Sequence, residues 1–383
     1  MNRKKVLSAA AVCGLAAALA LGAVFTRPSG RKPKDDGEKG AEETAFEFKI
    51  GVTHSESDAD SELAEKGFAD ALSDLLAGSG ENAVFTSTSI DASPGDPAAL
   101  SAEVSGSITA GCDLLFVTGD AALSAAAGQT KSLPIVAADV MDYPTVLGIS
   151  PSVWDGKTRT NVTGVSSAPD MEAVLSLLIE ATPDLRNVGL LTAEGDAKAL
   201  LQNRTMEAYL DEAGIPWKEY PLPLNANPEA AAAAEAAGTP LPTLESMTAL
   251  AATECSVLYL PADCSLTDSA ASIGNITKSL GKPLVAADRT AGASALVCAY
   301  ESPYAEGYMA GVIAVRILRD GYDPGELDIL SADTGFHKLY EKSYAEALGR
   351  AAFPKSFSEY SDFFSTYDFS SDVDRKAEIE KNS

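Results

Sequence analysis

Cys255-Ser-Val-Leu-Tyr-Leu-Pro-Ala-Asp263, followed by Lys282-Pro-Leu-Val-Ala-Ala-Asp288, decides the fold, because the chain carries nearly the same pattern earlier. The earlier copy is Cys112-Asp-Leu-Leu-Phe-Val-Thr-Gly-Asp120, followed by Leu133-Pro-Ile-Val-Ala-Ala-Asp139. Each copy predicts a buried strand, a polar turn with an acid, a helix, and a second buried strand that ends in an acid. Repeated β-α-β units build parallel sheets whose strand ends meet at one edge. The repeat therefore predicts an α/β protein with two Rossmann-like lobes whose loops face a shared cleft.

The sequence around the repeat extends this alternation of strands and helices. Strands are expected over residues 46–52, 83–90, 187–192 and 295–300, and helices over residues 61–77, 96–110, 171–181, 199–213 and 304–318. The last of these helices carries Gly307, Ala310, Gly311 and Ala314 on one side, a pattern suited to close packing.

The composition narrows the function classes. The 383 residues include 29 basic and 55 acidic ones, which argues against nucleic acid or an anionic lipid surface as a partner. Only two histidines are present, so neither a His-rich metal site nor a catalytic triad is expected, and no cofactor is predicted. Four of the five cysteines lie at or beside expected strands, where a free thiol behaves as a small apolar group.

The first 45 residues are expected to lie outside the folded part. Basic residues precede an apolar run from Val6 to Phe25, so residues 1–25 predict an export signal peptide or a membrane anchor. Cleavage, lipidation at Cys13 and retention as an anchor all remain open, and each places the folded part outside the cytoplasm. Residues 26–45 are polar and predict a flexible linker.

The folded part is divided as follows. Lobe 1 is expected to comprise residues 46–165 and 300–328, and lobe 2 residues 166–299 and 329–353. The Ala-rich segment 225–246 is interpreted as a surface insertion rather than a site, and residues 354–383 as an acidic C-terminal tail.

The ordered set of motifs resembles the tryptophan/tyrosine-type substrate-binding proteins of ABC transporters, which have the type I periplasmic-binding-protein fold. The resemblance spans roughly residues 48 to 350. Besides both copies of the repeat, it rests on Lys49-Ile-Gly-Val52, Lys66-Gly-Phe68, Asn161-Val-Thr-Gly-Val-Ser166, Pro183-Asp184, Val188-Gly-Leu-Leu191 and residues 295–307. Two expected binding loops depart from the family pattern: Asp58-Ala-Asp-Ser-Glu62 replaces a His-Pro-Ala-Leu-Asp-like run, and Glu301-Ser-Pro-Tyr304 replaces a Gly-Phe-Asp-Tyr run. An aromatic amino acid ligand is therefore not simply carried over.

The resemblance implies a monomeric solute receptor that closes its two lobes on a ligand by a three-strand hinge and presents it to an ABC permease in the membrane. The strand crossings are expected near residues 163–167, 297–301 and 327–331. Backbone N–H groups at helix N-termini suit a ligand carboxylate. An ammonium group would need carboxylates, for which Asp120, Asp142, Asp263 and Asp288 are the candidates.

Twelve residues are the candidate ligand contacts, and no catalytic or metal-binding residue is predicted. They are His54, Ser55, Gly119, Asp120, Ala121, Asp142, Ser166, Asp263, Ser265, Asp288, Ser302 and Tyr304. Each has a structural alternative. Asp120 and Asp263 suit helix caps, Asp142 a turn, His54 a solvated loop, and Tyr304 a core aromatic at the start of a helix, although Tyr304 or Tyr300 would also suit stacking on an aromatic ligand.

A second function class also fits two closing lobes: a sensory module that reports a ligand to a membrane partner, without transport. An enzyme is not expected, because the sequence lacks a Gly-rich phosphate loop, His-Glu-x-x-His, Gly-x-Ser-x-Gly and Cys-x-x-Cys.

Overall fold

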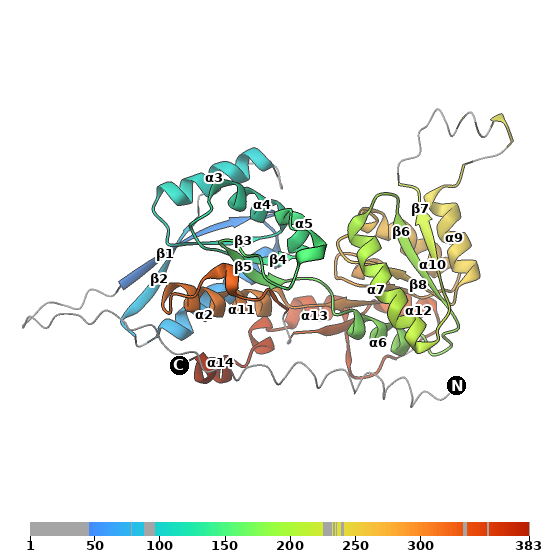
Figure 1. Ribbon diagram of the computed structural model, residues 1–383. Coiled ribbons are helices and arrows are strands. Elements are labelled where there is room, and N and C mark those ends of the chain that lie inside the picture. The colour runs from blue at the N-terminus through green and yellow to red at the C-terminus, as the bar shows by residue number, and fades with distance from the viewer. Residues whose placement is uncertain are drawn as a thin grey trace, which may run out of the picture.

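The computed structural model describes residues 46–382, apart from residues 78, 88–95, 225–231, 233, 235, 239–240, 332–334 and 351. Figure 1 shows two lobes, each built around its own β-sheet, with the chain passing between them. The expected signal or anchor over residues 1–25, the linker over residues 26–45 and much of the Ala-rich segment lie outside the described residues. Of the helices in the described ranges, none combines the length and the apolar character needed to cross a bilayer.

The first lobe contains a six-stranded parallel sheet in the order β11-β5-β4-β3-β1-β2. Its inner strands are continuous apolar runs because helices cover both faces of the sheet, and all five residues of β3 are buried. The strands are β1 (Phe46–His54), β2 (Glu81–Ser87), β3 (Leu114–Thr118), β4 (Ile135–Val140), β5 (Val162–Ser166) and β11 (Leu330–Ser331).

Two helix layers enclose this sheet. One face carries α2 (Ala59–Leu76) and α11 (Pro303–Leu318), and the other carries α3 (Pro97–Thr109), α4 (Asp120–Gln129) and α5 (Tyr143–Leu147). Alternate residues of each strand enter the two resulting cores: Phe116 joins the first and Leu115 the second. The helices begin where side-chain oxygens accept backbone N–H bonds, as Asp58 does for α2 and Asp96 for α3.

The second lobe contains a seven-stranded sheet in the order β13-β12-β10-β9-β8-β6-β7, with β10 and β12 antiparallel and all other pairs parallel. The order β7-β6-β8-β9-β10 repeats the order β2-β1-β3-β4-β5 of the first lobe, so the two copies of the sequence repeat form equivalent strands. The strands are β6 (Val188–Ala193), β7 (Trp217–Leu222), β8 (Val257–Leu260), β9 (Leu284–Ala286), β10 (Val297–Tyr300), β12 (His337–Tyr340) and β13 (Phe357–Glu359).

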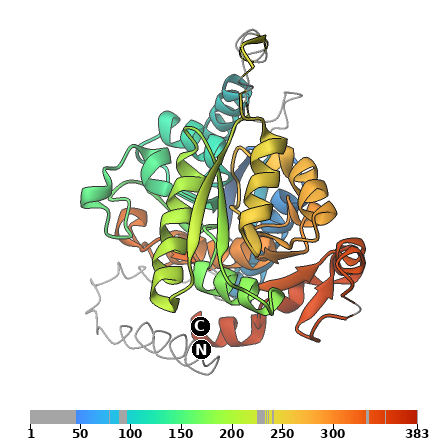
Figure 2. The ribbon, with the colours of Figure 1, turned by 90° about the vertical axis from the view of Figure 1, so that its right-hand side faces the viewer.

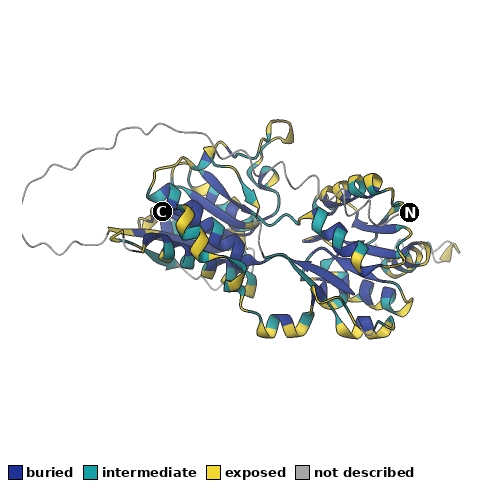
Figure 3. Ribbon diagram, turned by 90° about the horizontal axis from the view of Figure 1, so that it is seen from below, coloured by how far each residue is buried: buried dark blue, intermediate teal, exposed yellow. Residues whose placement is uncertain are grey.

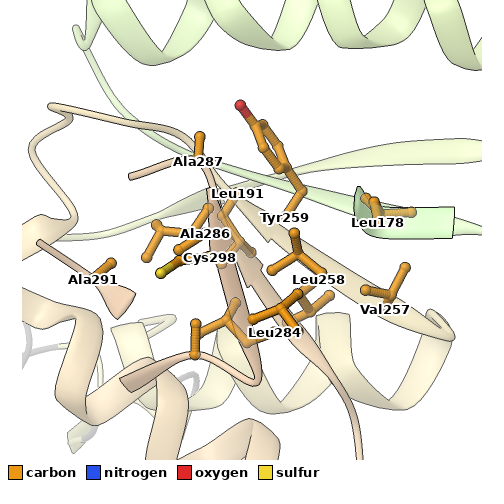
Figure 4. Packing of buried hydrophobic residues seen from close by; sticks show 14 of the residues in the cluster. Leu178, Leu191, Val257, Leu258, Tyr259, Leu284, Ala286, Ala287, Ala291 and Cys298 are labelled. Atoms are coloured by element: carbon orange, nitrogen blue, oxygen red, sulfur yellow. The ribbon is translucent and has the colours of Figure 1, made fainter. Parts of the chain in front are cut away.

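A single large core surrounds this second sheet. Figure 4 shows Leu191, Val257, Leu258 and Leu284 packed together within it. Figure 2 views the lobe from its outer side, and Figure 3 shows buried strands inside both lobes with exposed residues on the outer helices. The helices are α6 (Met171–Ala181), α7 (Ala197–Ala213), α9 (Leu244–Glu254), α10 (Ala270–Ser279) and α12 (Lys342–Ala347).

Short 3₁₀ turns complete the connections of both lobes. They are η1 (Pro151–Val153), η2 (Thr267–Ser269), η3 (Gly292–Ser294), η4 (Pro324–Glu326) and η5 (Phe369–Asp372).

Helices α2 and α11 pack unusually closely, as the row of small residues in α11 predicts. A Cβ atom at Gly307 would lie 1.9 Å from the Ala64 carbonyl oxygen, and one at Gly67 would lie 2.1 Å from the Tyr304 carbonyl oxygen. Both positions therefore require glycine, because the backbones of the two helices are in contact there.

The chain crosses between the sheets after β5, after β10 and after β11. Because β11 pairs with β5 in the first sheet, the last crossing lies beyond Ser331, later than the expected boundary between residues 328 and 329.

The C-terminal residues expected to form a separate tail are instead folded onto both lobes. β13 extends the second sheet beside β12, and α13 (Tyr360–Thr366) packs on the same core. Further along, α14 (Arg375–Asn382) packs against α2 of the first lobe. Figure 1 shows α13 low between the lobes and α14 beneath the first one. The aromatic residues of this segment explain the difference, because they supply apolar surface that an acidic tail would lack.

Candidate functional site

A cleft of about 610 Å³ lies between the lobes at the carboxyl ends of their parallel strands. From the first lobe it is lined by residues that follow β1, β3 and β4 and by the start of α11, and from the second by residues that follow β6, β8 and β9 and by the end of β10. This is the position at which open α/β sheets bind ligands.

Seven of the twelve candidate contacts line this cleft. They are Ser55, Gly119, Asp120 and Ala121 of the first lobe, and Asp263, Ser265 and Asp288 of the second. The structure thus brings together the loops at equivalent strand ends of the two lobes.

The other five candidates do not line the cleft. Asp142 caps α5 by accepting the Thr145 N–H at 3.2 Å, and buried Ser302 caps α11 by accepting the Ala305 N–H at 3.4 Å. Tyr304 is fully buried and donates its hydroxyl to Asp70 at 2.7 Å, as the core alternative predicts.

His54 and Ser166 also make bonds of their own. The two ring nitrogens of His54 lie 2.8 Å from Thr118 Oγ1 and 2.9 Å from Glu65 Oε2. The Ser166 hydroxyl donates to the Met141 carbonyl oxygen at 3.4 Å. These polar side chains at strand ends thus find their hydrogen-bond partners in neighbouring loops and helices. Their positions in the sequence nevertheless resemble those of ligand-binding residues.

The start of α4 forms one wall of the cleft. Its N-cap is Gly119, with φ 85°, and a Cβ atom there would lie 2.5 Å from Ser55 Oγ. Ser55 Oγ in turn accepts the Ala122 N–H at 2.9 Å. The remaining N–H groups of the first turn, those of Asp120 and Ala121, have no acceptor within the helix and lie at the cleft.

An ammonium group bridges the two lobes across the cleft. Lys198, in the first turn of α7, lies 2.7 Å from Asp120 of the first lobe and also binds Asp263 of the second lobe. Asp263 takes a positive φ of 43° and donates its backbone N–H to Asp288 at 2.8 Å. The Asp288 carboxylate also accepts the Ala291 N–H at 3.2 Å, so it organises its own loop.

A second ion pair crosses the cleft near the hinge. Arg289 follows β9, and its Nε lies 2.6 Å from Asp60 Oδ2 at the start of α2. The Arg289 guanidinium lies over the ring of Phe364, 5.1 Å from its centre, and Tyr300 donates its hydroxyl to Asp60 at 3.5 Å. Tyr300 lines the cleft but is almost completely buried, with its ring packed edge-on against Phe364.

Several cleft carboxyl groups have no cation partner among the described residues. Glu306 of α11 is 4 % exposed and accepts the Asp139 N–H at 3.3 Å through Oε2. Burial, and then the charge of Asp139, raise the pKa of Glu306 well above its ordinary value. Desolvation by the cleft walls, and then the charges of Asp263 and Asp60, raise the pKa of Asp139 to about 7. No group of three His, Cys, Asp or Glu side chains in the described part of the chain is placed to hold a metal ion.

Cleft residues that were not among the candidates predicted from the sequence include Asp60, Asp139, Lys198, Arg289 and Glu306. Arg289 directly follows a candidate strand end, and Asp60 lies in a loop that departs from the family pattern. The local sequence could therefore have indicated both as cleft residues. Lys198 and Glu306 lie within helices, where a charged residue in a single sequence carries no sign of facing a cleft.

The raised pKa values predict how stability depends on pH. Desolvation first, and neighbouring acids second, raise the pKa of Glu301 and Asp139 to about 7; desolvation raises that of Asp60 to about 6 despite Arg289. The folded state therefore holds protons that the unfolded chain has released, and its stability decreases as the pH rises through 6 to 7. The ligand-free protein is expected to melt at a higher temperature at pH 5.5 than at pH 8.

An Asp139→Asn variant is the control for this pH dependence, because it removes one of the titrating carboxyls. Its melting temperature should change less between the two pH values than that of the wild type. A wild-type melting temperature that is lower at pH 5.5 than at pH 8 would contradict the raised pKa values of these carboxyl groups.

Comparison with known proteins gives a family match over most of the chain. The model of the family described as ABC transporter substrate binding protein matches residues 49–349. No curated protein sequence gives a significant match.

Solved structures show a similar fold at low sequence identity. A substrate-binding protein with adhesive properties from Clostridium difficile, in a ligand-free, open form, is 21% identical with a TM-score of 0.63, covering 82% of this chain and 99% of that one. An ABC domain in complex with L-Trp from Streptococcus pneumoniae is 21% identical with a TM-score of 0.56, covering 80% and 96% of the two chains. These likenesses confirm the expected two-lobed α/β fold of type I periplasmic binding proteins.

Proposed function

The chain belongs to the family of ABC transporter substrate-binding proteins, and we propose that it holds an amino acid or a related carboxylate in the cleft between its lobes. Proteins of this family bind small molecules outside the cytoplasm and work with a membrane permease; they are not enzymes.

The observation that carries the proposal is the cleft itself, lined from both lobes by the loops at equivalent strand ends. A ligand ammonium group is served by carboxylates of both lobes, among them Asp120 and Asp263. A ligand carboxylate is served by the N–H groups of Asp120 and Ala121 at the start of α4, where the helix dipole favours negative charge.

Hinge closure follows from the connections between the lobes. Apart from the C-terminal segment between α13 and α14, the described chain crosses beside β5, β10 and β11, so a change in the backbone angles there turns one lobe against the other. A ligand that contacts both walls favours the closed form because it gains its second set of contacts only there. We propose that the receptor acts as a monomer, and that residues 1–25 direct its export.

The test is a thermal-shift screen of the purified full-length chain with amino acids, nucleosides and small carboxylates. A ligand at a hundredfold excess over its dissociation constant adds about 2.7 kcal/mol to the free energy of unfolding, or roughly 5 to 10 °C in a domain of 150–250 residues. Asp120→Asn should reduce the shift that a hit produces. The control is Asp362→Asn, an exposed residue of α13 outside the cleft, which should leave the shift unchanged. A full panel without any shift would contradict the proposal.

A further inference from the structure

The cleft has a pronounced excess of acidic side chains. Ten carboxyl side chains line it against two cations, Lys198 and Arg289. Both cations are already bound to carboxylates: Lys198 to Asp120 and Asp263, and Arg289 to Asp60. Within the described residues, the cleft therefore offers an incoming anion no uncommitted cationic side chain.

Asp139 and Glu306 are desolvated carboxyl groups of the cleft without a counter-charge among the described residues. Glu306 is almost completely buried yet lines the cleft, and its one hydrogen bond, through Oε2, leaves Oε1 without a donor among the described residues. The Asp139 side chain has neither a hydrogen bond nor an ion pair within the same residues. Ionising a desolvated carboxyl group without a counter-charge is costly, so an added cation would stabilise the ionised form of both groups.

Lys198 shows how a primary ammonium group fits this cleft. Its Nζ is held between a carboxylate of the first lobe, Asp120, and one of the second, Asp263, so a single ammonium contacts both walls. The Lys198 side chain is partly exposed, and its flexible stem allows the ammonium to leave.

We propose that the cleft selects solutes with a net positive charge carried on primary ammonium groups, and that Lys198 is the internal cation with which such a solute competes for Asp120 and Asp263. The inference rests on the proposed function and specifies the ligand class for the same cleft. It covers both amino acids with a cationic side chain and amines without a carboxylate, because the ammonium group is the feature that these carboxylates recognise.

The test uses three matched solutes, lysine, norleucine and cadaverine, in calorimetric titrations of the purified full-length chain. Norleucine lacks the terminal ammonium of lysine, and cadaverine lacks the carboxylate. Lysine, cadaverine or both are expected to bind at least tenfold more tightly than norleucine. Binding of lysine alone identifies an amino acid ligand, and binding of cadaverine identifies a carboxylate-free amine. Norleucine binding as tight as that of both cationic solutes would overturn the inference.

Two variants test the role of Lys198. Lys198→Met keeps the length of the side chain and removes the competing charge, so it should tighten binding of the cationic solute several-fold. Lys218→Met makes the same change at an exposed ion pair on β7 outside the cleft and should leave the affinity unchanged. Asp139→Asn should weaken binding. Unchanged or weaker binding by Lys198→Met would overturn the assigned competition.

Different results would contradict the receptor function and the selection of cationic solutes. A neutral or anionic solute that shifts the melting temperature, while lysine and cadaverine do not, would leave the receptor function standing and overturn the charge selection. A failure of every solute in the wide panel contradicts the receptor function itself.

Discussion

Adding one methyl group at Gly307 is expected to destabilise the first lobe, whereas the same change at Gly128 is expected to stabilise it. The Cβ atom of Gly307→Ala would lie 1.9 Å from the Ala64 carbonyl oxygen, so α2 and α11 must move apart. Helix backbones cannot yield as a side chain does, and the loss should be at least about 3 kcal/mol, at the upper end of overpacking costs. Urea unfolding of the purified chain, followed by circular dichroism, measures it.

Gly128 is the matched control for Gly307, because it is exposed in helix α4 and no heavy atom of the described residues lies within 4 Å of a Cβ placed there. Gly128→Ala should add about 0.5 to 1 kcal/mol through helix propensity. Gly67→Ala should resemble Gly307→Ala, and the double variant should cost less than the sum of the two, since one separation of the helices relieves both contacts. Equal small effects at Gly307 and Gly128 would contradict the close packing.

The strand pairing of both lobes followed from the repeated motifs because buried parallel strands leave a strong local signal. The apolar run Leu114–Thr118 and its counterpart Val257–Leu260 are covered on both faces, so nearly every residue is apolar. The close packing of α11 could also be predicted from its row of small residues, since only glycine permits backbone contact at Gly307.

The candidate site was predicted less completely, for a physical reason. An acid at a strand end is equally suited to capping the next helix and to contacting a ligand: Asp142 caps α5, whereas Asp120 lies at the cleft. The cleft cations were missed because Lys198 and Arg289 obtain their roles from partners in the other lobe. Such pairing depends on how the lobes meet, which local sequence patterns do not encode.

The C-terminal segment lies beyond the residues that the family model matches, and its packing could not be predicted from its charge. Phe363 and Phe364 pack around Tyr300 of the second sheet. Phe369 contacts the cores of both lobes, and α14 continues onto the first lobe. The segment thus adds a link between the lobes to the three strand crossings.

Arg375 fixes the end of this link to the first lobe. Its Nε and Nη2 each donate to the Asp74 carboxylate at 2.6 Å, and Nη1 donates to Asp70 at 3.4 Å. Arg375→Ala should cost about 1 to 2 kcal/mol, because a bidentate pair with a largely buried carboxylate is stronger than an exposed pair. Lys376→Ala, in the adjacent exposed position, should change the free energy of unfolding by less than about 0.5 kcal/mol.

Ending the chain before Phe357 is expected to have a far larger effect than ending it after Val373. The shorter chain loses β13 with Phe357, and it loses the aromatic rings over Tyr300, among them Phe363; Phe357 and Phe363 are at most 7 % exposed. Burial of each such ring contributes about 1.5 to 3 kcal/mol, so the loss approaches the whole stability of a typical domain, about 5 to 15 kcal/mol. The longer chain loses α14, and with it the Arg375 pair, the Arg316 bond to Asn382 and the packing of Ile379, so its loss should exceed that of Arg375→Ala but stay below that of the shorter chain. Calorimetric melting of both truncated chains and of the full chain measures these losses. Loss of even one buried ring should lower the melting temperature by more than about 2 °C. A chain ending before Phe357 that melts within about 2 °C of the full-length chain would therefore show that the segment does not stabilise the fold.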